Sequence, residues 1–128
     1  MRKYFVALVF LLFYVNQVYA ISALLRQELK KLDPNTRLEQ RCDIAAMEII
    51  ASLHKYAPDK TIAYSFAEPV INGNIIKAPG AAFRSHNNWY HLAFICTTTD
   101  DKLDIKSFTY NIGKIVPRSE WEHYYLVP

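Results

Sequence analysis

The 128-residue sequence is poor in several residue types and patterns, and each shortage narrows the range of functions. It contains two cysteines and three glycines, and it has no CxxC, GxSxG, SxxK or phosphate-binding glycine pattern. These absences argue against a redox or zinc motif, a common serine hydrolase and a nucleotide site. We therefore expect no cofactor, and we expect catalysis only if two carboxylates lie close together in the fold.

Excess charge of one sign is also nearly absent. The formal net charge is +3, and Arg2 and Lys3 supply two of these positive charges. Without them, 13 basic residues stand against 12 acidic ones. Because nucleic-acid binding needs a clustered basic face, the composition predicts no nucleic-acid partner.

A short apolar run follows the basic N-terminus. Residues 4–15 carry no charge, and Val18 and Ala20 place compact residues where a signal peptidase reads them. A membrane-spanning helix needs roughly 20 apolar residues, and this run has about twelve. We predict a signal peptide over residues 1–20, cleaved after Ala20, and a periplasmic or secreted protein. The alternative is an uncleaved membrane anchor, because residues 18–25 are again mostly apolar.

The remaining residues, 21–128, have the usual size of one domain. Its two cysteines, Cys42 and Cys96, would lie in an oxidising compartment, so we predict a disulfide between them. Such a bond closes a loop of about 55 residues, for which chain entropy predicts a stabilisation of ~4 kcal/mol. The alternative is a pair of buried free thiols.

The first third of this domain has helical patterns. Residues 22–32 predict one helix. A second begins either at Asp33 with Pro34 as its first residue, or at Thr36 with Glu39 in a capping box, and runs to Leu53 or Lys55. Its apolar residues recur at three- and four-residue steps and predict one buried stripe, made of Leu38, Cys42, Ala45, Ala46, Ile49, Ile50 and Leu53. Its charged residues are expected to point elsewhere: Arg37, Glu39, Arg41 and Asp43.

After Asp59 the sequence changes to strand patterns. Strands are predicted over residues 62–66, from 75 to the break at Pro79-Gly80, and over 81–85, 89–97 and 103–112, with turns at Asn72-Gly73 and residues 86–88. Within the last strand the apolar residues change from odd to even positions, which predicts a β-bulge near Lys106-Ser107. A capping box from Ser119 to Glu122 predicts a short C-terminal helix. The predicted fold is α+β, with N-terminal helices packed on an antiparallel sheet of about four strands. The disulfide would join the helix stripe to the central strand, 89–97.

Few side chains combine into a chemical site. The four histidines lack the spacing of metal ligands, so no metal is predicted. A carboxylate pair could form among Asp33, Glu39, Asp43 and Glu68, although a solvated charged face is the simpler interpretation. A ligand platform could form from Trp89, Tyr90, Trp121, Tyr124 and Tyr125, although an aromatic core is again simpler.

Several segments together resemble a known bacterial family. They are residues 32–43 (LDPNTRLEQRCD), 80–85 (GAAFRS), 89–90 (WY), Phe94 with Cys96, 112–113 (IG) and 117–122 (PRSEWE). In this order they resemble the domain of unknown function numbered nine hundred and thirty, met in alphaproteobacteria. The resemblance implies an exported or membrane-tethered envelope protein and implies no particular reaction.

Taken together, these features predict a non-catalytic exported module that binds another envelope or extracellular protein or polymer. Its expected contact surface consists of Asp33, Arg37, Glu39, Arg41 and Arg84. One alternative is a small hydrolase that acts on envelope polymers through paired carboxylates, and another is an aromatic-lined ligand-binding protein. Membrane association is expected only through an uncleaved N-terminal segment.

Overall fold

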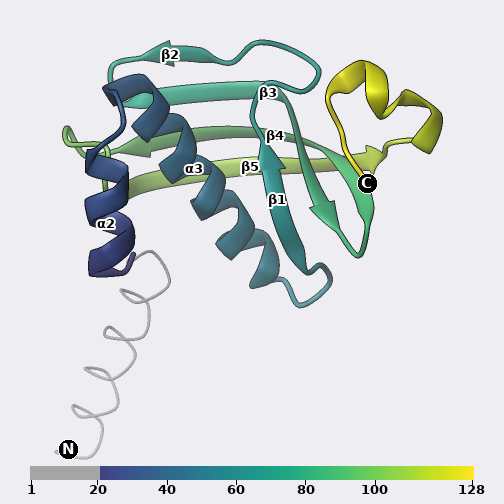
Figure 1. Cartoon of the computed structure of the whole chain (residues 1–128), viewed down its shortest axis with the longest axis horizontal. Coiled ribbons are helices and arrows are strands. Elements are labelled where there is room, and N and C mark those ends of the chain that lie inside the picture. Colours follow the sequence, from purple (N-terminus) through teal and green to yellow (C-terminus); the bar gives the residue numbers. More distant parts are fainter. Residues whose placement is uncertain (1–20) are drawn as a thin grey trace, which may run out of the picture.

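The computed structural model describes residues 21–128, which form one α+β domain. Two helices, α2 (Ala23–Lys30) and α3 (Pro34–Ala51), come before all the strands. In Figure 1, α3 runs across one face of the sheet and α2 stands beside its first turns. The predicted signal peptide lies outside the described residues. No helix within residues 21–128 is long and apolar enough to cross a membrane.

Both helices begin at side-chain caps. The Ser22 hydroxyl accepts a hydrogen bond from the backbone N–H of Leu25, and the Asp33 carboxylate accepts one from that of Thr36, each at 3.1 Å. Asp33 is therefore the cap of α3, with Pro34 at the first helical position, where a missing N–H has no cost. The helix ends at Ala51, before the predicted Leu53 or Lys55. The N–H groups of Leu53 and His54 donate to carbonyls three residues back, and the left-handed φ of 58° at His54 then turns the chain away.

The sheet contains five antiparallel strands. They are β1 (Pro58–Ile62), β2 (Val70–Asn72), β3 (Ile75–Ser85), β4 (Asn88–Thr98) and β5 (Ile105–Ile115). The order is β1-β3-β4-β5, and β2 pairs with the first part of β3. The predicted turns are present, and His86 and Asn87 take the positive φ values that a two-residue hairpin turn requires. As predicted, β4 is an inner strand.

The predicted strand over residues 62–66 is wrong, because β1 ends at Ile62 and the chain turns across β3. The backbone N–H of Phe66 donates to the Gly80 carbonyl at 2.7 Å, and a Cβ on Gly80 would lie 2.8 Å from the Cβ of Ala67. Pro79 and Gly80 therefore do not interrupt β3. They form a bulge inside one continuous strand, where a glycine permits the crossing.

The predicted bulge in the last strand is confirmed. Thr97 pairs with Ser107 while Thr98 pairs with Ile105, so Lys106 is the extra residue of β5. A second shift, between the pairs Tyr90–Ile115 and Leu92–Ile112, was not predicted. There, a Cβ on Gly113 would lie 2.8 Å from the Cβ of His91.

The predicted C-terminal helix is replaced by two 3-10 turns, η1 (Arg118–Glu120) and η2 (Glu122–Tyr124). No side-chain cap forms at either turn, so Ser119 does not close its capping box. The Trp121 indole instead donates to the carbonyl of Val116 at 3.0 Å, and the Trp89 indole donates to that of Val127 at 2.8 Å. These bonds hold the C-terminal segment against the sheet.

Two apolar clusters occupy opposite faces of the sheet. The larger one lies under α3 and contains Leu38, Ile50, Ile76, Phe83, Leu92 and Phe94 among others. The smaller one lies under the C-terminal segment and contains Ile62, Ala82, Trp89, Val116, Trp121 and Leu126. The sheet is thus covered by helices on one face and, at one end, by the C-terminal turns on the other (Figure 1).

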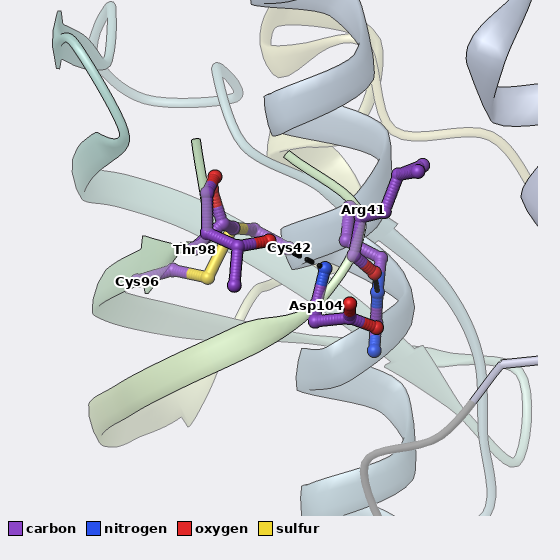
Figure 2. Close-up of a disulfide and its surroundings, with 7 residues drawn as sticks. Arg41, Cys42, Cys96, Thr98 and Asp104 are labelled. Carbon is purple, nitrogen blue, oxygen red and sulfur yellow. Dashed lines mark hydrogen bonds between the residues drawn. A yellow bond between two sulfur atoms is a disulfide. The ribbon is translucent and has the colours of Figure 1, made fainter. Parts of the chain in front are cut away.

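The predicted disulfide between Cys42 and Cys96 is present and joins α3 to β4 through the larger cluster. Both residues are fully buried. Figure 2 shows Arg41 next to this bond, with Thr98 and Asp104 nearby. The cross-link therefore fixes the helix layer on an inner strand of the sheet.

Candidate functional site: an acidic groove along the edge of β1

A groove of about 340 Å³ runs along β1, between α3 and the C-terminal segment. One wall comes from α3, through Glu39, Gln40, Asp43, Ile44 and Met47. The other comes from Tyr64, Tyr125 and Val127. The floor is made of four consecutive residues, Asp59 to Ile62. Because successive strand residues point to opposite faces, this run places the groove at the edge of the strand.

Asp43 is the most unusual residue of this groove. Asp43 is only 6% exposed, and its Oδ1 has no hydrogen-bond partner among residues 21–128. Burial raises the pKa of Asp43 well above its ordinary value, and the charge of Glu39 raises it further. A buried carboxyl oxygen without a partner destabilises a fold, so its presence calls for a reason other than stability.

Glu39 lies one helical turn before Asp43 and is half-buried. Burial raises its pKa, and the negative charge of Glu68 adds to this effect. Glu39 thus repels Asp43 in the groove wall and is itself repelled by Glu68, an exposed residue that does not line the groove. The sequence singled out these three carboxylates as candidates for convergence, together with Asp33.

Hydroxyl groups complete the polar lining. The Oγ1 of Thr61 is buried without a hydrogen-bond partner among the described residues. Tyr64 and Tyr125 lie at the rim, with ring centroids 6.2 Å apart in an edge-on arrangement, and are 44% and 68% exposed. Two residues that line the groove, Asp43 and Thr61, thus each carry a buried polar atom without a partner, and aromatic rings lie at the entrance.

A family model described as Domain of Unknown Function (DUF930) matches residues 29–126. The chain belongs to this family. No curated protein and no solved structure matches the chain. The region matched by the DUF930 model includes both cysteines and every groove residue except Val127. The groove is therefore part of the DUF930 domain itself.

Most of the surface residues predicted for the DUF930 domain have structural roles and lie outside the groove. Asp33 caps α3, and its other oxygen accepts from the Thr36 hydroxyl at 2.6 Å. Arg84 donates two hydrogen bonds to Asp59, at 2.9 and 3.1 Å, and a third to the Pro128 carbonyl. Of the five predicted contact residues, Glu39 alone lines the groove.

Arg37 and Arg41 hold the β4–β5 loop against the helices of the DUF930 domain. Arg37 donates to the carbonyls of Leu29, Lys30, Leu32 and Asp101 at 3.0–3.1 Å. Arg41, which was expected to point away from the core, is fully buried, and its Nε donates to the Leu103 carbonyl at 2.7 Å. A buried residue contributes no contact surface.

Arg41 and Asp43 are buried because neighbouring segments cover more of the circumference of α3 than the predicted stripe alone. The sheet covers the predicted stripe, but β1 closes in on one flank of the helix and the 99–104 loop on the other. Helical periodicity identifies the residues that face the sheet and carries no information about neighbours on the flanks. Leu53, predicted in the stripe, lies beyond the helix and is exposed.

The aromatic residues of the DUF930 domain divide between core and rim. Trp89 and Trp121 are buried in the smaller cluster, where each indole N–H is hydrogen-bonded. Of the five aromatics named from the sequence, Tyr125 is the one that lines the groove. Among residues 21–128, no group of three or more His, Cys, Asp or Glu side chains is placed to hold a metal ion.

Proposed function

We propose that this protein is an exported envelope module that binds another envelope component through the groove along β1. The observation that carries the proposal is the carboxyl of Asp43, buried at the groove and lacking a partner for Oδ1. A polar group that is buried without a partner lowers the stability of a protein. Residues that reduce stability in this way are typical of binding and catalytic sites.

Export is supported by two independent features of the chain. The N-terminal sequence combines a basic start, a short apolar run and compact residues before Ile21. The disulfide between Cys42 and Cys96 is of the kind that persists in oxidising compartments. We propose cleavage after Ala20 and a periplasmic or secreted location.

Photo-cross-linking in intact cells tests the proposal. A photoreactive amino acid is introduced in place of Tyr125, at the groove rim, or in place of Val70, which is exposed on β2. We expect a defined cross-linked species from position 125 that is absent from position 70 and is lost when Asp43→Asn is added. A species that survives Asp43→Asn, or that forms equally from both positions, would contradict the proposal.

A second candidate function rests on the carboxyls of Glu39 and Asp43. Asp43, whose pKa burial raises well above its ordinary value, suits a general acid, and Glu39 lies one turn away as the second carboxyl. Hydrolases that act on glycans commonly use two carboxyls in such roles. The protein is incubated with purified envelope glycan and the released reducing ends are measured. Release that Asp43→Asn and Glu39→Gln both abolish supports this function, and no release from the unmodified protein removes it.

A further inference from the structure

We propose that the groove accepts an extended peptide that adds as a strand to the edge of β1 and places a basic side chain against Asp43 and Glu39. This inference rests on the proposed function and identifies the partner as a protein segment. Three properties of the groove carry it: its position on a strand edge, its unbalanced negative charge and the nature of its walls.

The strand edge supplies the backbone part of the recognition. Within residues 21–128, β1 pairs with β3 and with no second strand. Asp59, Lys60, Thr61 and Ile62 all line the groove, so it runs along the strand that has this one paired edge. An extended peptide pairs with the other edge of such a strand by continuing the antiparallel ladder, which is a common mode of peptide recognition.

The charges of the groove supply the specificity. Asp59 already has partners, because Arg84 donates to both of its oxygens and Lys60 lies close enough to lower its pKa. The pKa values of Glu39 and Asp43 shift the other way, because burial and the charge of a neighbouring carboxylate both raise them. A ligand cation would relieve this repulsion. Since the carboxyls are already desolvated by the fold, little further desolvation of the protein opposes binding.

The walls suit the long stem and charged head of a basic side chain. Ile44 and Met47 of α3 offer apolar surface to the methylene groups of a lysine or arginine. The exposed rings of Tyr64 and Tyr125 at the entrance attract a cation through their π faces. An amino-bearing glycan would share the charge contact but would make no strand pairing with β1.

Synthetic peptides test this arrangement directly on the purified chain. The probe is an acetylated and amidated seven-residue peptide of alternating threonine and valine with a central lysine. A matched peptide carries norleucine, which keeps the stem and removes the charge. Two further lysine peptides carry N-methyl groups on every second amide, the first peptide on one alternating set of amides and the second on the other set. Because alternate amides of a strand point to opposite edges, only one of these two peptides loses its hydrogen bonds to β1. Binding is measured by fluorescence anisotropy, and the contacted amides are mapped by NMR.

We expect the lysine peptide to bind at least tenfold more tightly than the norleucine peptide. Asp43→Asn should abolish this difference, whereas Glu120→Gln, an exposed carboxyl outside the groove, should leave it unchanged. One of the two N-methylated peptides should lose binding while the other retains it. The amide shifts should cover Asp59 to Ile62.

Several results would overturn the inference. Equal affinity of the lysine and norleucine peptides would exclude the charge contact, and equal affinity of the two N-methylated peptides would exclude strand addition. Binding of a chitosan oligomer without binding of any peptide would identify a polymer ligand. If the peptides fail while cross-linking from position 125 still depends on Asp43, the inference is wrong and the proposed function stands. If both fail, the proposed function is wrong as well.

Discussion

Burial raises the pKa of Asp43 in the groove beside β1, and the charge of Glu39, one turn earlier on α3, raises it further. Both carboxyls lie on the flank of α3 that faces β1, away from the disulfide stripe. The same helix therefore carries the structural cross-link on one side and the candidate site on another. Changes at the two places should have opposite effects on stability.

The first prediction concerns the pH dependence that Asp43 gives to folding. Its pKa is higher in the folded state than in the unfolded chain, so the folded protein binds the extra proton more tightly. Stability should therefore fall as the pH rises from about 4 through the folded pKa. The Asp43→Asn variant should lack this decline and be more stable at pH 8 by about 1–3 kcal/mol.

Urea unfolding of both proteins at pH 4, 6 and 8 measures this difference. Glu120→Gln serves as the control, because that carboxyl is exposed and should give the unmodified pH profile. An Asp43→Asn variant that is less stable than the unmodified protein at pH 8 would show that the carboxyl has a stabilising partner.

The second prediction concerns the disulfide. It links residues 54 positions apart, and the chain-entropy relation gives such a loop a stabilisation of about 4 kcal/mol. The double variant Cys42→Ala, Cys96→Ala should lose stability of this order in denaturant unfolding. Unfolding of the reduced, unmodified protein is measured as well, because it separates the stability lost with the cross-link from the stability lost with the sulfur atoms. A loss below about 1 kcal/mol in both would contradict the loop-entropy explanation.

The third prediction concerns Arg41. Its Nε–H is the donor to the buried carbonyl of Leu103, so Arg41→Met keeps most of the apolar stem but removes this bond. We expect a loss of about 1–3 kcal/mol in denaturant unfolding. Lys114→Met, at an exposed position of β5, should change stability by less than about 0.5 kcal/mol. Equal effects at the two positions would exclude a structural role for Arg41.

Much of the fold could be predicted from local sequence patterns. The parity slip between Ile105 and Phe108 identified the bulge at Lys106, since strand periodicity records which face each side chain occupies. The presence of two cysteines in a chain with a predicted export signal predicted the bond between Cys42 and Cys96. Both inferences depend on information carried by neighbouring residues or by residue type.

The candidate site could be predicted only in part, because contacts between distant segments create it. Of the four carboxylates that could converge, Glu39 and Asp43 line the groove, but nothing local indicates that Thr61 or Tyr125 lies beside them. The pattern of Ile62, Tyr64 and Phe66 is typical of a strand. The chain nevertheless leaves the sheet after Ile62, so that Phe66 stacks on His91 with ring centroids 4.1 Å apart.

The last prediction concerns export, which would place the disulfide in an oxidising compartment. If residues 1–20 are a signal peptide, the mature protein should begin at Ile21 when its N-terminus is sequenced. Replacing the compact residue before the cleavage point, as in Ala20→Arg, should block processing, because the peptidase reads that position. Tyr19→Phe, at the position between the two that are read, should be processed normally. An intact N-terminus at Met1 in a membrane fraction that resists alkaline extraction would show instead that the segment is retained as an anchor. The proposed peptide-binding groove would then work at the membrane surface.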